Sequence, residues 1–147
     1  MKPGVLTVCF LTFLIAGVSA DDTKKAFLTS EEAGPEFAVQ GEYTGSIKAG
    51  DNNVKIGVQV IAEGEGKLAW VAYIGGLPGD GWDGNEPLRG KGEMNGKSAV
   101  LKGDHGTGEI KDGSLVITNE DNVRVGEISK TTRVSPTIGR KPPEGAV

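Results

Sequence analysis

The sequence predicts an all-β protein: a single small antiparallel β-sandwich or barrel, with one short helical turn at its start and a long Gly/Trp-rich loop. Apolar and polar residues alternate with a period of two in several stretches after residue 36, and no helical period exceeds one turn. Short turns rich in Gly, Asn and Asp separate these stretches. Aromatic residues make up only 5% of the chain, so Val, Ile, Leu and Ala must form the core.

The first twenty residues have the pattern of a secretory signal peptide. Lys2 precedes an apolar run from Val5 to Val18, and Ala20 ends a cleavage site of small residues. The alternative is a membrane anchor, but the run is short for a span, which needs about 20 apolar residues. The sequence therefore predicts a secreted or periplasmic protein without a membrane span, whose mature chain begins at Asp21.

Charge and cysteine content restrict the partners and the chemistry. Cleavage after residue 20 would remove Lys2 and no acid, which changes the net charge from −4 to −5. It would also remove Cys9, the only Cys, and with it any disulfide or thiol chemistry. A mildly acidic chain argues against nucleic acid and anionic membranes as partners.

Residues 21–35 are expected to form a polar lead-in with the short helical turn. Thr29 and Glu32 have the spacing of a capping box, and a Gly-Pro pair then ends the helix after about one turn. Phe27 and Leu28 are the expected anchors of this turn on the domain.

The β-domain is expected over residues 36–130, with its first strand starting at Phe37. Val54–Ala62 shows the clearest alternation, and Leu68–Ile74 is apolar on both faces, as in a central strand. A Glu-Gly-Glu-Gly turn between them predicts that they are adjacent antiparallel strands. The later strands are expected at Ser98–Lys102, Gly106–Lys111, Ser114–Thr118 and Val123–Ile128.

Two stretches lack the alternating pattern of a strand. Residues 131–147 are rich in Pro, Ser, Thr and Gly, which predicts a stiff linker to a further domain beyond Val147. Tyr73–Glu93 combines Gly, Pro, acids and Trp82, which predicts a shaped loop. Its glycines at 76, 79, 81 and 84 are expected to include positive φ angles.

The loop holds the candidate binding residues Trp82, Asp80, Asp83 and Arg89. Trp82 is expected either to plug an open end of the sheet or to act as a platform for a sugar ring, and the plug is preferred because aromatic residues are scarce. In either case its indole N–H should reach a carbonyl or a loop carboxylate. Arg89 is expected to pair with a loop acid, and an anionic-ligand site is the alternative.

Catalytic and metal chemistry find little support in the residues. His105, beside Asp104, is interpreted as a turn residue, because neighbouring strand residues point to opposite faces. Asp80 and Asp83 could act with Glu86 as glycosidase carboxylates, or with Asn85 as calcium ligands, but Asp and Gly also form turns without chemistry. No catalytic residue, metal ligand or cofactor is assigned.

Three stretches together resemble a known family. Val39–Gly45, Ile56–Ala62 and above all Tyr73–Gly84 are similar to an amino-terminal β-domain of exported bacterial proteins. In that family the domain precedes a 3-keto-disaccharide hydrolase domain, a concanavalin-like jelly roll. The Pro142–Val147 segment resembles the lead-in to that jelly roll.

The resemblance implies a role outside the cytoplasm in a protein that acts on sugars. The leading hypothesis is a non-catalytic accessory module whose partner is the downstream jelly-roll hydrolase domain in the same polypeptide. The alternatives are a carbohydrate-binding module that uses the Trp82 loop, with a saccharide as partner, and an independent hydrolase.

Overall fold

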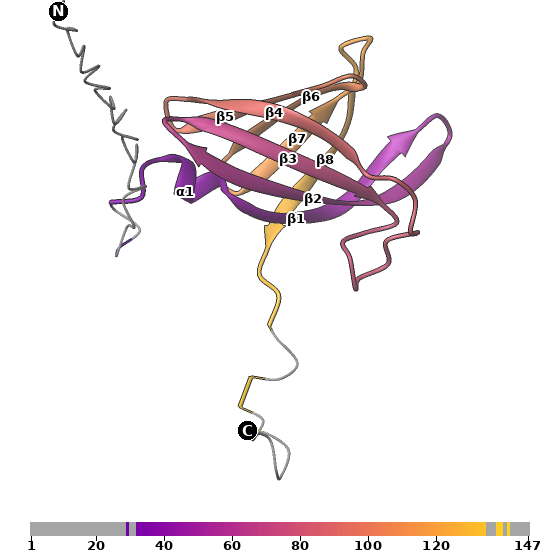
Figure 1. The fold of residues 1–147 in the computed structure, drawn as a ribbon. Helices are drawn as coiled ribbons and strands as arrows, with labels where there is room; N and C mark the ends of the chain where they lie inside the picture. Colours follow the sequence, from indigo (N-terminus) through magenta and orange to yellow (C-terminus); the bar gives the residue numbers. More distant parts are fainter. Residues whose placement is uncertain (1–28, 30–31, 135–137, 140, 142–147) are drawn as a thin grey trace, which may run out of the picture.

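The computed structural model describes residues 29, 32–134, 138–139 and 141. They form a closed barrel of eight antiparallel strands that follow one another in sequence order, and β8 pairs with β1 to close it (Figure 1). The elements are α1 (Glu36–Val39), β1 (Gly41–Ala49), β2 (Asn52–Gly64), β3 (Lys67–Ile74), β4 (Leu88–Asn95), β5 (Ser98–Gly103), β6 (Gly106–Lys111), β7 (Ser114–Thr118) and β8 (Arg124–Thr131). The all-β prediction is confirmed, and of its two forms the barrel is the one observed.

The predicted pairing of the two clearest strands is confirmed. β2 and β3 are antiparallel neighbours, with Val60 opposite Trp70 and a tight turn between Gly64 and Lys67. Side chains alternate along β2: Ile56, Val58 and Val60 belong to the core. The bounds of β6 and β7 are those expected from the sequence.

β4 was not predicted, because its residues were assigned to the loop. The loop ends at Pro87, and residues from Leu88 onward pair with β3 and β5. Gly90 and Gly92 hide the strand pattern, since they replace the apolar residues that alternation requires. Their lack of a side chain is needed: a Cβ on Gly90 would lie 2.5 Å from the Trp70 ring, and one on Gly92 would lie 2.6 Å from a Leu101 methyl.

Part of the predicted helical turn, residues 30 and 31, lies outside the described residues, and the helix that the structure describes lies after it. The Glu32 N–H donates to Thr29 Oγ1 at 3.4 Å, but the helix lies later, at Glu36–Val39, with Pro35 as its N-cap residue. Proline at a helix start is favoured because its fixed φ suits the helix. Phe37, expected to begin the first strand, therefore lies in α1.

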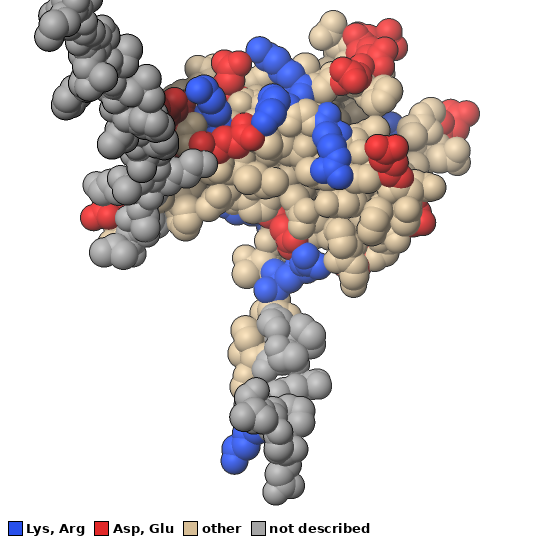
Figure 2. All heavy atoms as spheres, viewed as in Figure 1, with Lys and Arg blue, Asp and Glu red and all other residues tan. Residues whose placement is uncertain are grey.

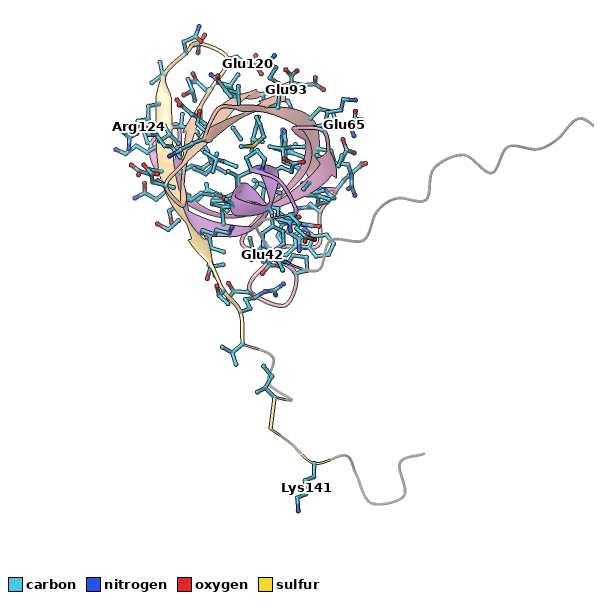
Figure 3. The ribbon with its side chains drawn as sticks, turned by 90° about the vertical axis from the view of Figure 1, so that its left-hand side faces the viewer. Glu42, Glu65, Glu93, Glu120, Arg124 and Lys141 are labelled. Atoms are coloured by element: carbon cyan, nitrogen blue, oxygen red, sulfur yellow. The ribbon has the colours of Figure 1, made fainter. Side chains whose placement is uncertain are left out.

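α1 closes one end of the barrel (Figures 1 and 3). Val39 joins the core, and its carbonyl accepts a hydrogen bond of 2.6 Å from the buried Tyr43 hydroxyl. Burial raises the pKa of Tyr43 to about 12. Glu36, only 7% exposed, accepts a bond from the Gly66 N–H in the β2–β3 turn.

The chain ends are described only in part. The signal peptide, Phe27 and Leu28 lie outside the described residues, as does most of the expected linker. Thr131 was predicted to start that linker but is the last residue of β8. In the part of the chain that the structure describes, no helix qualifies as a membrane span.

Candidate functional site

The barrel contains a cavity of about 320 Å³ at the end opposite α1. It lies among the turns β1–β2, β5–β6 and β7–β8, and the exposed residues Gly50 and His105 belong to its wall, so it opens to solvent there. Its apolar lining residues are Ile47, Ile56, Val58, Trp70, Ala72, Leu88, Leu101, Leu115, Ile117 and Val125. An eight-stranded barrel has an interior that its side chains can just fill or that can hold one small ligand.

Trp70 is the largest side chain in the cavity wall. Its indole N–H donates a hydrogen bond of 3.0 Å to the Lys102 carbonyl, and this bond links the ring to β5. Gly90 and Gly103 lie against the ring, and a Cβ on either one would collide with it. Trp70 is partly buried and packs against the core, and its ring also lines the cavity.

His105 lies at the rim of the cavity, in the turn between β5 and β6. Its Nδ1 is 3.3 Å from a carboxylate oxygen of Glu120, which belongs to the β7–β8 turn. The pair therefore links two turns of the rim. His105 is a turn residue, as expected, and its contact is Glu120 rather than the adjacent Asp104.

The Gly/Trp-rich loop, residues 75–87, lies against the outer wall of the barrel. Leu77 is completely buried, and it covers Gly57 of β2. A Cβ on Gly57 would lie 2.5 Å from the Leu77 backbone nitrogen, so only glycine allows this close approach. The loop glycines at 76, 79, 81 and 84 all have positive φ, as predicted.

Trp82 packs on the outside of the barrel. Its ring meets Tyr73 edge-on, with centroids 5.4 Å apart, and its indole N–H donates to the Asn85 carbonyl at 3.0 Å. The predicted N–H partner is therefore confirmed. The preferred idea that Trp82 plugs an open end is wrong: the residue is 38% exposed and does not line the cavity. The ring stays outside because the loop docks on an outward-facing glycine.

Two of the three loop acids, Asp80 and Asp83, have structural partners. Asp80 pairs with Lys55 at 3.3 Å. Asp83 accepts hydrogen bonds from the backbone and side chain of Asn85, and these bonds lower the pKa of Asp83. Arg89, expected to pair with a loop acid, has no carboxylate partner among the described residues. The reason is that Arg89 belongs to β4 rather than to the loop.

Arg133 fastens the loop to the chain that leaves β8. It donates to the Pro78 carbonyl at 2.8 Å and forms a two-bond pair with Glu42. The hydrogen bond from Arg133 lowers the pKa of Glu42. This contact is not predictable from the sequence, because residues 42, 78 and 133 are far apart in the chain and no pattern connects them.

The cavity was not predicted either, because no single motif in the sequence marks it. The alternating pattern predicted that one face of each strand is apolar, but the volume of the cavity depends on how the barrel closes. Among the described residues, no three His, Cys, Asp or Glu side chains gather as metal ligands would.

Comparisons with protein-family models, with curated proteins and with solved structures found no match for this chain.

Proposed function

We propose that this barrel is a non-catalytic binding module that holds a small, mainly apolar molecule in its open end. The observation that carries the proposal is the cavity of about 320 Å³, which apolar residues line and α1 closes at the opposite end. Ligand sites in proteins are typically concave and mostly apolar, with volumes of about 300–1,000 Å³. The volume favours a ligand at the small end of that range.

A direct test uses N-phenyl-1-naphthylamine, an uncharged fluorophore, as the probe. The wild type should show saturable binding at one site. Ala72 is buried in the cavity wall, so Ala72→Phe should fill the space and weaken probe binding at least about tenfold, through loss of the volume the probe needs. Ala69 lies on the same strand, β3, but does not line the cavity, so Ala69→Phe is the matched control.

The two variants separate cavity binding from surface adsorption. Thermal melts of both variants should show that each is folded. Equal probe binding by folded Ala72→Phe and by the wild type would contradict the proposal, as would an absence of saturable binding in the wild type.

The family resemblance favours a second candidate: an accessory module of an exported, sugar-active protein. The conformation of the Gly/Trp-rich loop supports it, since this loop carries the most specific part of the resemblance. Arg133 ties this loop to the chain leaving β8, so the loop has a defined position beside the segment that leaves the barrel. In this role the downstream hydrolase domain would be the partner.

The alternative role for the loop is carbohydrate binding, which the exposed face of Trp82 favours. The test is a titration of the wild type, Trp82→Ala and Trp82→Phe with oligosaccharides, followed by loop NMR shifts. Binding that Trp82→Ala abolishes and Trp82→Phe retains would support a stacking platform. Unchanged spectra in the wild type would rule out the sugar platform and leave the docking role.

A further inference from the structure

The wall of the cavity contains one fully charged side chain, that of Lys48. Lys48 is exposed near the end of β1, and the two residues after it, Ala49 and Gly50, also line the cavity, so this end of β1 borders the mouth. Among the described residues, no carboxylate pairs with Lys48. Its ammonium group is therefore available to a ligand.

A second lining residue, Asn119, presents a hydrogen-bond donor. It lies just after β7, and its side-chain oxygen accepts bonds of 3.1 and 2.9 Å from the backbone N–H groups of Asp121 and Val123. Only the oxygen of an amide can accept such bonds, so the two bonds fix which way the amide points. The group that Asn119 has left for a ligand is its NH₂, which only donates.

The acids near the mouth lie outside the cavity wall. None of the acids in the three surrounding turns lines the cavity: Asp51, Asp104, Glu120 and Asp121. Figure 2 shows acidic side chains gathered over the β7–β8 turn, at the upper right of the view. Glu120 also has a local partner in His105. Water and salt weaken exposed charges steeply with distance, so the cation in the wall should act on a bound end group more strongly than these acids do.

The deeper wall offers nothing to a charged or polar group. Among the described residues, every buried side-chain nitrogen or oxygen already has a hydrogen-bond partner. A charge carried into such a wall would lose its hydration without compensation. Any polar end of a ligand must therefore remain at the mouth, where Lys48 and Asn119 line the cavity.

We infer that the cavity binds small apolar molecules that carry a carboxylate at one end. The apolar body packs against the wall around Trp70, and the carboxylate accepts hydrogen bonds from the Lys48 ammonium group and the Asn119 amide. A hydrogen bond between two charged groups is stronger than one between neutral groups, so a carboxylate is favoured over an alcohol or an amine of the same length. This inference rests on the proposed function, because it concerns the same cavity.

The experiment compares three molecules of equal chain length, octanoate, 1-octanol and octylamine, as competitors of N-phenyl-1-naphthylamine at pH 7 and low salt. Octanoate should displace the probe at a concentration at least about tenfold lower than octylamine, the size of effect expected from one charge in contact at a protein surface. Octanol should lie between them. Added salt should narrow the difference, since it screens exposed charges.

Two variants of Lys48 identify the source of the selectivity. Lys48→Gln removes the charge and keeps a polar side chain, so octanoate binding should weaken at least about fivefold while octanol binding changes less than about twofold. Lys48→Glu should reverse the order and favour octylamine over octanoate. Lys97→Gln is the control, because Lys97 is an exposed lysine in the β4–β5 turn that does not line the cavity.

Asn119→Asp tests the second donor. The new carboxylate keeps an oxygen for the two backbone N–H groups and replaces the NH₂ donor with an acceptor, so octanoate binding should weaken in this variant as well. Thermal melts should show that all four variants are folded.

The possible failures are distinguishable. If the probe binds and octylamine competes as well as octanoate, the preference for carboxylates is wrong while the binding module stands. If folded Lys48→Gln binds octanoate as tightly as the wild type does, the inference is also overturned. If the probe itself does not bind, the proposed function fails.

Discussion

Leu77 should control the docking of the whole Gly/Trp-rich loop. It is fully buried in a loop whose residues from Gly79 to Glu86 are all exposed, so a single side chain holds most of the loop's apolar contact with the barrel. Leu77→Ala should lower the free energy of unfolding by about 3 kcal/mol, within the range of about 2–5 kcal/mol for buried Leu→Ala changes. For a domain of this size, the melting temperature should fall by about 12 °C.

Gly57→Ala should disrupt the same contact from the other side. The new methyl group would lie 2.5 Å from the Leu77 backbone nitrogen and 2.7 Å from Leu77 Cγ, so the loop must move away. Gly57 faces outward, between the cavity-lining residues Ile56 and Val58, so the barrel interior is not affected. Since both substitutions remove one docking contact, the double variant should cost little more than either single variant.

Urea and thermal melts of the two single variants and the double variant would measure this coupling. Ile61→Ala is the control, because Ile61 lies on the same strand but is 49% exposed, and its loss should cost less than about 0.5 kcal/mol. Fully additive effects of Leu77→Ala and Gly57→Ala would refute the idea that they undock one loop. A Leu77→Ala melt close to that of the wild type would refute its role altogether.

Three further variants test other parts of the fold. Tyr43→Phe should lower the free energy of unfolding by about 1–3 kcal/mol through loss of its buried hydrogen bond. In the wild type, the free energy of unfolding should fall between about pH 10 and 12, because the hydroxyl ionises first in the unfolded chain. Thermal melts over that pH range would measure this fall. Gly90→Ala should destabilise by about 1–3 kcal/mol and change the fluorescence of Trp70, against which its methyl would collide. Arg133→Ala should change stability little, because the pair is exposed to solvent, but NMR should show the pKa of Glu42 rising toward its ordinary value.

Much of the barrel could be predicted from alternation alone. A strand with one face in the core must repeat its apolar residues every second position, and β2 does so with Ile56, Val58 and Val60. β4 was not predicted as a strand because its inward positions include glycines, which leave room for the side chains of Trp70 and Leu101. Apolar alternation cannot be recognised in a strand whose inward positions are glycines and whose share of the interior is filled by side chains from neighbouring strands.

The candidate site was less predictable than the fold. The positive φ angles of the loop glycines and the bonded indole of Trp82 follow from local rules, and both were predicted. The outward position of Trp82 depends on Leu77 meeting Gly57 across the β-sheet, and the partner of Arg133 lies 91 positions away along the chain. No local pattern encodes such contacts.

The fold class, the central hairpin of β2 and β3 and the conformations of the loop glycines follow from the amino-acid sequence, because they depend on side-chain periodicity and on residues next to one another. Three features become visible only in the folded protein: the sheet closes as a barrel, the loop lies on its outer wall, and one end of the barrel contains a cavity. These features depend on how side-chain volumes from eight strands sum around a closed ring. That sum exists only once the strands have come together.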